Sequence, residues 1–404
     1  MPDGERECSI CHRHDYLKDG ETECEICWTL KQMSGNILKG DFFTVTSKKE
    51  KTCLPLPGNC YLVTDTESTL RKRMKEDNYY IRSYSKNKPY SGYYVSTKLW
   101  VGDYVNGETF EELGQRATGI ERIAVMRADV DNLGQAFVRG FENEKNGSKY
   151  VTLSRTATFS RKLSMFFKYH INSLLKEGGY SILEEEVQME KEDDRRNALI
   201  VYSGGDDIFI VGAWDDIIGF AVDLHDNLME YSQDTLKISA GIGIYPSKYP
   251  ISIMARETGR LEEAAKSVEG KNAVALFDEK YTFPWEEFIE NVVEEKLYFI
   301  QKYFKVVDEK GKNFLYNLLE LVRKRKEDKI NIARFAYLLG RMEPKVQRGE
   351  KKEEIEEKRD LHREFSRKMY EWIRVEKDAK ELEMAIYLYV YTKREKEEHD
   401  GVNE

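Results

Sequence analysis

Long apolar runs are absent from this sequence of 404 residues: no stretch approaches the roughly 18 consecutive apolar residues that a membrane-spanning helix needs. We therefore expect no transmembrane helix. The first six residues also lack the apolar core of a secretory signal, so no export signal is expected. Together these absences predict a cytoplasmic protein that does not enter membranes.

An excess of positive charge is also missing. Charged residues make up 34% of the chain, yet the formal net charge is −9. A net negative chain is not expected to bind nucleic acid over its whole surface, so any contact with RNA must come from a local patch or from partner subunits. The heavy use of both signs predicts networks of surface ion pairs.

Cysteine is scarce, but its spacing is informative. Four of the six cysteines form two Cys-x-x-Cys pairs, Cys8 with Cys11 and Cys24 with Cys27. Two such pairs in a chain without an export signal favour a metal over disulfides. Four thiolates leave no open coordination position, so we predict a structural Zn²⁺ site, a zinc knuckle. The alternative is a set of reduced thiols without metal.

The most informative stretch is residues 198–212, in which two short apolar runs flank Ser203-Gly204-Gly205-Asp206-Asp207. The runs are typical of strands, and Gly-Gly suits a tight hairpin because glycine adopts positive φ without steric cost. Two adjacent carboxylates repel each other, and a divalent cation such as Mg²⁺ or Mn²⁺ would neutralise them. The alternative is a solvated turn that happens to contain two aspartates.

A second stretch, residues 122–134, is predicted to be a strand that ends in Asp129-Val130-Asp131. Alternation would place Asp129 and Asp131 on the same side if the strand continues. Asn132 can then turn the chain into a helix, whose free N–H groups favour phosphate. An acidic strand end together with an acidic hairpin is the arrangement that a two-metal nucleotidyl transferase needs.

The predicted elements from residue 122 to 277 run strand, helix, strand-hairpin-strand, helix, strand, helix and a short strand at 273–277. The βαββαβ order of the first six indicates a ferredoxin-like palm, similar to that of GGDEF nucleotidyl cyclases. In that fold the first strand lies beside the strand that begins at the hairpin. We therefore expect Asp129 to meet Asp206 and Asp207 in space.

Two lysines, Lys266 and Lys271, lie at the end of the last palm helix. Either could reach triphosphate oxygens as a point charge. The alternative is that they compensate the helix dipole before a glycine cap.

The chain as a whole is predicted to be α+β. The expected domains are a zinc knuckle at 1–35, a mixed linker module at 36–118, the palm at 119–282 and an all-α bundle at 283–404. Strand-like runs within the linker module lie at 42–45, 61–63, 79–81 and 93–95. The helical stripes of the bundle show no chemistry, and docking to a partner is its expected role.

The two acidic motifs resemble those of a known family, the Csm-type large subunit of type III CRISPR effector complexes. The likeness rests on Tyr202 to Phe209 and Arg127 to Gly134, with further pieces at 163–167 and 239–242. The order of zinc knuckle, palm and helical domain also matches, so the resemblance covers essentially the whole chain.

This resemblance implies that the chain takes part in polymerising ATP into cyclic oligoadenylate when the complex binds target RNA. By motif match, Mg²⁺ or Mn²⁺ would be held by Asp129, Asp206 and Asp207, which would also be the catalytic residues. The nucleotide-binding residues expected from motif and position are Ser203, Gly204, Gly205, Asn132, Lys266 and Lys271, the lysines by likeness to GGDEF cyclases. The implied partners are the other subunits of the ribonucleoprotein and, through the complex, guide RNA and target RNA.

The family's subunit begins with a metal-dependent HD nuclease and a first palm domain, neither of which this sequence shows. The chain is therefore expected to be a piece of a larger subunit or the product of a split gene. Alone it is expected to bind nucleotide weakly, and the family's single-stranded DNase activity is not expected of it.

Two other functions compete with the synthetase. The chain could be a non-catalytic, zinc-containing scaffold that docks RNA-binding partners. A GGDEF-type dinucleotide cyclase fits less well, because the Glu-Phe that ends that family's motif is replaced here by Asp207-Ile208.

Overall fold

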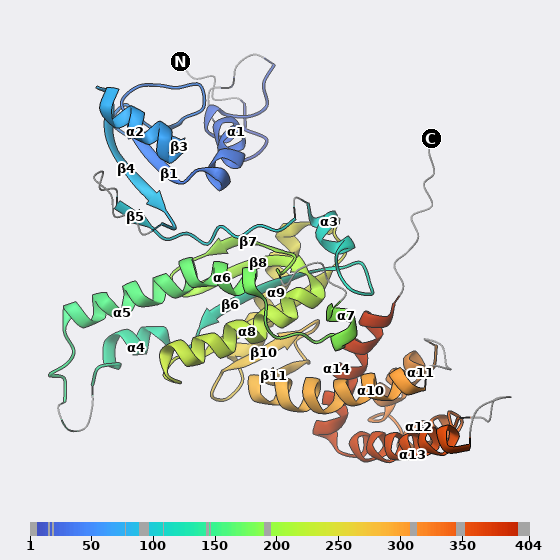
Figure 1. Ribbon diagram of the computed structural model, residues 1–404. Coiled ribbons are helices and arrows are strands. Elements are labelled where there is room, and N and C mark those ends of the chain that lie inside the picture. Colours follow the sequence, from blue (N-terminus) through green and yellow to red (C-terminus); the bar gives the residue numbers. More distant parts are fainter. Residues whose placement is uncertain are drawn as a thin grey trace. The chain divides into compact units, whose positions relative to one another are not determined.

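The computed structural model divides the chain into two compact units, Met1–Asp103 and Tyr104–Glu404 (Figure 1). The four-domain division stays a prediction, but the structure puts 1–35 and 36–103 in one unit and 104–118 in the same unit as the palm. The structure describes residues 6–14, 17, 20–76, 78–88, 97–107, 109–142, 145, 147–189, 195–307, 313–344 and 352–394.

The first unit is built on a mixed sheet with the strand order β2-β3-β1-β4-β5. Its central strand β1 pairs antiparallel with both β3 and β4. The predicted strands at 42–45 and 61–63 are confirmed as parts of β1 and β3. The one at 79–81 overlaps β4, which begins at Tyr80, and the one at 93–95 lies outside the described residues. The elements are α1 (Glu25–Lys39), β1 (Phe42–Thr46), β2 (Leu54–Leu56), β3 (Cys60–Asp65), α2 (Glu67–Glu76), β4 (Tyr80–Lys86) and β5 (Thr97–Leu99).

The second unit contains a mixed sheet with the strand order β11-β10-β9-β6-β8-β7. Strand β6 pairs antiparallel with β8 on one side and β9 on the other, so the expected neighbour of the first palm strand is confirmed. Beyond β9 the sheet is extended by β10, which is parallel to β9, and by β11. The strands are β6 (Ile123–Val130), β7 (Ala198–Ser203), β8 (Asp207–Ala213), β9 (Ile238–Tyr245), β10 (Ala273–Leu276) and β11 (Thr282–Pro284).

Helices cover both faces of this sheet (Figure 1). On one face α5, the π-helical turn η1, α6 and α8 share a core with Ala124, Met126 and Ala128 of β6. On the other face α3 and α9 pack with Ile123 and Val125. Because strand side chains alternate, this pattern places the side chain of residue 129 on the face that α9 covers. The helices are α3 (Phe110–Gln115), α4 (Leu133–Arg139), α5 (Leu153–Met165), η1 (Phe166–His170), α6 (Ile171–Glu177), α7 (Glu185–Met189), α8 (Trp214–Ser232) and α9 (Ile251–Lys266).

Helix α9 packs directly against the backbone of β9 at Gly241. A Cβ at this position would lie 2.6 Å from the backbone oxygen of Thr258 and 2.8 Å from the carbonyl carbon of Leu261. A side chain at this position would collide with α9, so the glycine permits the close approach that places the end of α9 over the sheet.

The predicted C-terminal helical region is confirmed, and its buried side chains belong to the same core as those of the sheet. In the part of the chain that the structure describes, every helix is too short or too polar to span a lipid bilayer. The helices are η2 (Glu287–Leu297), α10 (Tyr298–Val306), α11 (Asn313–Lys324), α12 (Ile330–Gly340), α13 (Lys352–Arg374) and α14 (Glu376–Lys393).

The end of α14 is joined to the segment before β6, and we expect Gly119→Ala to break this junction. Gly119 has a φ of +74°, and a Cβ there would lie 2.5 Å from the Thr392 backbone oxygen and nearer still to that of Tyr391. Alanine in the left-handed region of φ and its clash with the backbone of α14 should together lower the free energy of unfolding by roughly 2–5 kcal/mol. Urea denaturation measures this change.

The matched control is Gly340→Ala at the end of α12, where a Cβ would meet no heavy atom within 4 Å. This change should leave the free energy of unfolding within about 1 kcal/mol of wild type. Equal effects at both positions would contradict the close junction.

Candidate active site and metal centre

The predicted hairpin joins β7 to β8, and the Gly204 N–H donates to the Asp207 backbone oxygen at 2.8 Å. The prediction that the two glycines are needed for positive φ is wrong, because neither has one. At Gly204 the reason is space: a Cβ would lie 2.6 Å from the Tyr202 hydroxyl oxygen and would overlap the Asp207 carboxylate. At Gly205 a Cβ would meet only the Ser164 Oγ, at an ordinary 3.7 Å.

The sheet register brings the two acidic motifs together. Asp129 of β6 is the direct partner of Asp207 of β8, and the Val130 N–H donates to the Asp206 backbone oxygen at 3.2 Å. Residues directly opposite on neighbouring strands share a face, so Asp129 and Asp207 both lie on the α9 side. The meeting expected from the sequence is confirmed in the register.

The carboxylates of Asp129, Asp206 and Asp207 lie at the adjoining ends of β6 and β8, which we call the acidic edge, and they repel one another. Burial raises the pKa of Asp206, and the negative charges of Asp129 and Asp207 raise it further, while Lys266 acts in the opposite direction. A cluster whose ionised form is disfavoured by its own members is stabilised by an added cation, which is why such clusters are candidates for function.

Lys266 lies within this cluster. Its Nζ is 2.5 Å from Asp129 Oδ2 and 2.7 Å from Glu262 Oε1, and Arg127 Nε is 3.2 Å from the other oxygen of Glu262. Burial alone would lower the pKa of Lys266, but the hydrogen bonds to Asp129 and Glu262 outweigh burial and raise it. The result is a row of alternating charges along the face of α9, at the place where the sequence predicts a cation.

This ion pair bears on the predicted metal ligands. Among the described residues, the carboxylates of Asp129, Asp206 and Asp207 do not form a group within 4.8 Å of one another, whereas the four cysteines do. Lys266 already neutralises Asp129 and holds one of its carboxylate oxygens, Oδ2. A divalent cation would have to replace Lys266 at this oxygen or bind Oδ1, and the roles of the three aspartates stay a prediction.

The remaining predicted site residues lie around the same edge. The Ser203 hydroxyl donates to the Phe167 backbone oxygen, which ties the end of β7 to the π-helical turn η1. Such turns are frequent at functional sites. Lys271 Nζ donates to Asn132 Oδ1 at 2.8 Å, so these two predicted nucleotide-binding residues are neighbours.

Two acidic residues of this edge were not predicted from the sequence. Glu262 precedes Lys266 by four residues, and this helical pair was the available signal. For Asp131 the sequence predicted only a position on the same side as Asp129, but β6 ends at Val130 and the Asp131 side chain is buried.

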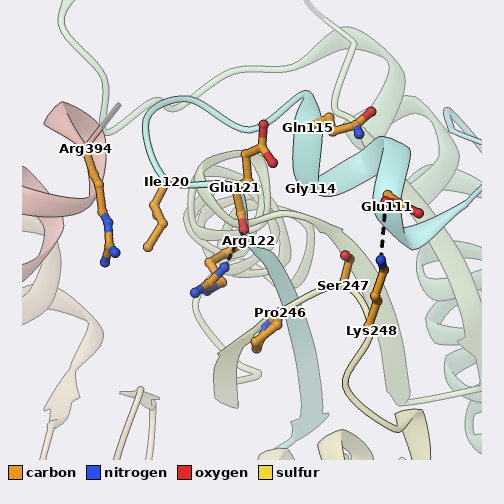
Figure 2. A pocket seen from close by; sticks show the side chains of 10 residues that line it. All are labelled: Glu111, Gly114, Gln115, Ile120, Glu121, Arg122, Pro246, Ser247, Lys248 and Arg394. Atoms are coloured by element: carbon orange, nitrogen blue, oxygen red, sulfur yellow. Dashed lines mark hydrogen bonds and ion pairs between the residues drawn. The ribbon is translucent and has the colours of Figure 1, made fainter. Parts of the chain in front are cut away.

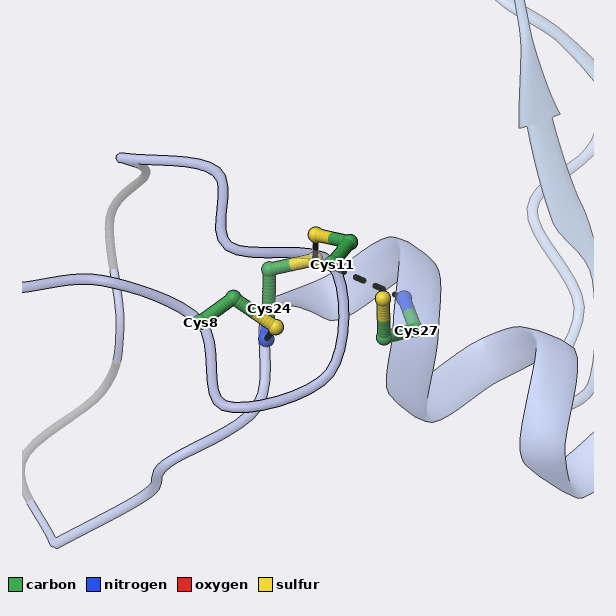
Figure 3. Close-up of side chains that lie close together, drawn as sticks. All are labelled: Cys8, Cys11, Cys24 and Cys27. Carbon is green, nitrogen blue, oxygen red and sulfur yellow. Dashed lines mark hydrogen bonds between the residues drawn. The ribbon is translucent and has the colours of Figure 1, made fainter. Parts of the chain in front are cut away.

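The four predicted zinc ligands converge in the first unit (Figure 3). Their sulfur atoms all lie within 4.8 Å of one another, and Cys11 Sγ is 3.8 Å from Cys24 Sγ. A tetrahedron with Zn–S bonds of 2.3 Å has edges of about 3.8 Å, whereas a disulfide needs about 2.05 Å. The residues therefore fit a structural Zn²⁺ and do not fit disulfides.

The thiols of this cluster differ in acidity. The backbone N–H groups of Cys11, Cys24 and Ile10 lower the pKa of Cys8 to about 6. The neighbouring Cys11 sulfur, followed by burial, raises the pKa of Cys27 to about 12. Packed sulfurs compete for negative charge, and a bound cation would remove that competition.

A separate hollow lies at the opposite end of β6 (Figure 2). It is lined by α3, the segment before β6, the loop after β9 and Arg394. Lys248 and Glu111 form an ion pair there at 3.9 Å, and Arg122 donates to the backbone oxygen of the preceding residue at 2.9 Å. None of the predicted site residues lines this hollow, so it is separate from the acidic edge.

Comparison with known proteins places these features in one family. Residues 122–275 match the family model of the Cas10/Cmr2 second palm domain. Residues 301–395 match that of the second helical domain of the Cmr2 subunit of the CRISPR RNA silencing complex.

Similar proteins extend this match along the chain. The chain is 42% identical, over 98% of its length, to the CRISPR system single-strand-specific deoxyribonuclease Cas10/Csm1 (subtype III-A) of Mycobacterium tuberculosis, and it covers 47% of that protein. A Csm1–Csm4 subcomplex of the type III-A interference complex aligns with a TM-score of 0.61 and 25% identity, covering 91% of this chain and 50% of that one. A Csm1–Csm4 cassette in complex with cA4 shares the fold, with a TM-score of 0.60 and 23% identity, covering 88% of this chain and 49% of that one.

The chain thus spans about half the length of the curated relatives that it matches. The three aspartates, strands β6 to β9 and helices α11 to α14 fall within the residues that these two models match. Over this region the chain belongs to the Cas10/Csm1 family of type III-A CRISPR large subunits.

Proposed function

We propose that this chain is the palm and helical part of an effector subunit that binds ATP with Mg²⁺ or Mn²⁺ and polymerises ATP into cyclic oligoadenylate when the complex binds target RNA. The observation that carries this proposal is the pairing of Asp129 with Asp207 across β6 and β8, with Asp206 beside them. The Csm1 relative whose fold this chain shares was solved with cA4, which supports the same product class.

In the proposed reaction a 3′-hydroxyl oxygen forms a bond to the α-phosphorus of ATP, the bond from that phosphorus to pyrophosphate breaks, and the hydroxyl proton passes to solvent. A bound divalent cation would supply Lewis-acid stabilisation of the developing charge. Asp129, Asp206 and Asp207 would hold it, because hard oxygen ligands suit such ions.

The other residues of the edge would orient the triphosphate. Lys266, which pairs with Asp129 and Glu262, would contact phosphate oxygens, and Lys271 would supply a second charge beside Asn132. Gly204 leaves the Asp207 carboxylate room to turn toward its ligand.

The test uses the complex assembled with its other subunits and target RNA, supplied with ATP and Mn²⁺, with the products separated by chromatography. We expect metal-dependent oligoadenylate from the wild type. Gly204→Ala should lower the rate by about 100-fold, because a shift of the Asp207 carboxylate misplaces the reacting groups. The free energy of unfolding should change little, since the atoms that must move are the ends of flexible side chains.

Gly340→Ala is the control, because Gly340 lies outside the candidate site and its Cβ would meet no heavy atom within 4 Å. Activity of this variant should stay close to that of the wild type. A wild-type complex that makes no metal-dependent product would contradict the proposed function, and equal losses at both glycines would contradict the role given to Gly204.

A second candidate function is a non-catalytic scaffold, favoured by the cysteine cluster and by the helical region that shares one core with the sheet. Titration of the isolated chain with ATP separates the two functions. Absence of metal-dependent binding at millimolar ATP would favour the scaffold.

A further inference from the structure

Asp131 connects three segments of the second unit. Its side chain is 6% exposed, and its Oδ2 accepts hydrogen bonds from the Ser239 hydroxyl and from the Asn272 backbone N–H, both at 2.9 Å. Its own N–H donates to the Lys237 backbone oxygen at 2.8 Å. The carboxylate therefore joins the end of β6 to the beginning of β9 and to the turn that follows α9.

That turn has an unusual backbone. Gly270, Lys271 and Asn272 are consecutive residues with φ values of +81°, +54° and +51°. Left-handed conformations are unfavourable for L residues and persist only where surrounding contacts determine them. Here the Trp285 backbone N–H donates to the Asn272 backbone oxygen at 3.1 Å, and Asp131 accepts the Asn272 backbone N–H, so the turn is held from two sides.

Stability alone does not account for a carboxylate at this position. The second oxygen of Asp131, Oδ1, and the side-chain oxygen of Asn272 are both buried without a hydrogen-bond partner in the described part of the chain. Buried acceptors without donors are unfavourable, and a position selected only for packing would avoid them. An unfavourable but well-anchored group beside a candidate active site suggests that its geometry serves function.

The geometry points to Lys271. Its Nζ lies 2.8 Å from Asn132 Oδ1, and Asn132, which directly follows Asp131, is itself left-handed with a φ of +54°. Asp131 thus stands between the two strained turns that carry Asn132 and Lys271. We propose that Asp131 is a positioning residue, which fixes the turn after α9 so that Lys271 is held beside Asn132 to bind a phosphate group of the nucleotide. This proposal rests on the proposed function of the site.

The first test is kinetic and uses the assembled complex with ATP and Mn²⁺. Asp131→Ala should raise the KM for ATP by about 10-fold with a smaller change in kcat, because Lys271, which binds the phosphate, loses the residue that positions it. Asp131→Asn keeps an oxygen that can accept the Asn272 N–H and should recover most of the affinity. Ser239→Ala leaves the contact to Asn272 in place and should have a smaller effect than Asp131→Ala.

A double-mutant cycle tests whether Asp131 acts through Lys271. Lys271→Ala should raise the KM by itself, and adding Asp131→Ala should raise it little further, because the group that Asp131 positions is already gone. Fully additive effects, or a loss confined to kcat, would overturn the proposal.

The last measurement does not depend on catalysis. Hydrogen exchange of the full chain without ATP or metal should show faster exchange of the Asn272 amide in Asp131→Ala than in the wild type, and protection in Asp131→Asn. Unchanged exchange would overturn the proposal that Asp131 holds the turn after α9, even if the complex makes oligoadenylate. Conversely, a complex that makes no oligoadenylate would remove the proposed function while the exchange result still decides whether Asp131 holds the turn.

Discussion

Replacing Asp206 and Asp207 together by alanine is expected to abolish oligoadenylate formation by the assembled complex, with a loss of roughly 1,000-fold or more. Losing the cation removes several kcal/mol of charge stabilisation, and each 1.4 kcal/mol corresponds to about a factor of ten in rate. The measurement is product formation from ATP with Mn²⁺. Product at the wild-type level in the double variant would contradict a catalytic role for the hairpin.

The same double substitution, which lowers activity, should raise the free energy of unfolding of the metal-free chain at neutral pH. Burial and the charges of Asp129 and Asp207 raise the pKa of Asp206 in the folded chain. A carboxyl whose folded pKa lies above its unfolded pKa stabilises the fold at low pH, and this contribution is lost as pH rises through the folded pKa. Without metal, the double alanine variant should therefore be more stable than wild type at neutral pH, and the difference should shrink in acid.

The control is Glu230→Ala on α8, whose side chain is exposed and lies outside the acidic edge. Urea denaturation of the metal-free chains at pH 5 and pH 8 measures the effect. A double variant that is less stable than wild type at both pH values would indicate that the aspartates stabilise the fold. Its loss of activity would then carry no information about catalysis.

The neighbour relations of the acidic strands could be predicted because they depend on local patterns. A hairpin joins consecutive strands, and a βαββαβ order leaves few choices for the first strand. The pairing of Asp129 with Asp207 follows from these two rules. The short strand predicted at 273–277 is confirmed as β10, but its parallel pairing with β9 and the edge strand β11 were not predicted.

The side-chain contacts of the site were less predictable, because they depend on which helix covers which strand. Lys266 could be recognised as a cation near the end of a helix, but its bond to Asp129 requires α9 to lie over β6. Gly204 was predicted for the wrong reason. Its φ is ordinary, and the carboxylate that it makes room for becomes visible only in three dimensions.

Asp131 shows where a correct rule reaches its limit. Alternation along a strand would have placed its side chain beside that of Asp129. Strand β6 ends one residue earlier, at Val130, and Asn132 adopts a left-handed conformation, so the side chain of Asp131 is directed to Ser239 and Asn272 instead. Strand ends are where sequence patterns are least informative, and this site is built from strand ends.

Removing the metal from the cysteine cluster is expected to unfold the beginning of the first unit, from the cluster to α1. The apolar cluster around the thiols consists of little more than the cysteines themselves, with Leu17 buried and Ile26 packed against them, and α1 adds the buried Met33. Small cores of this kind are usually stable only with a metal or disulfides. A strong chelator should therefore cause faster hydrogen exchange in residues 20–39, and metal analysis of the untreated chain should give about one Zn²⁺ per molecule.

The cluster also predicts how zinc binding depends on pH. With a pKa of about 6, Cys8 is mostly ionised at neutral pH, whereas Cys27, with a pKa of about 12, is protonated. Zinc must displace the Cys27 proton but hardly any from Cys8, so binding should release protons and tighten as pH rises. Calorimetry in buffers of different ionisation enthalpy measures this release.

Variants separate the metal site from general effects of losing a thiol. Cys27→Ser should abolish zinc binding and reproduce the effect of the chelator, because it removes one of four ligands. Cys60→Ser, at a cysteine of the same unit that lies outside the cluster, should leave the zinc content unchanged. If the untreated chain contains no zinc and the chelator leaves hydrogen exchange unaltered, the four thiols pack as ordinary side chains. The first unit is then held together by its sheet alone.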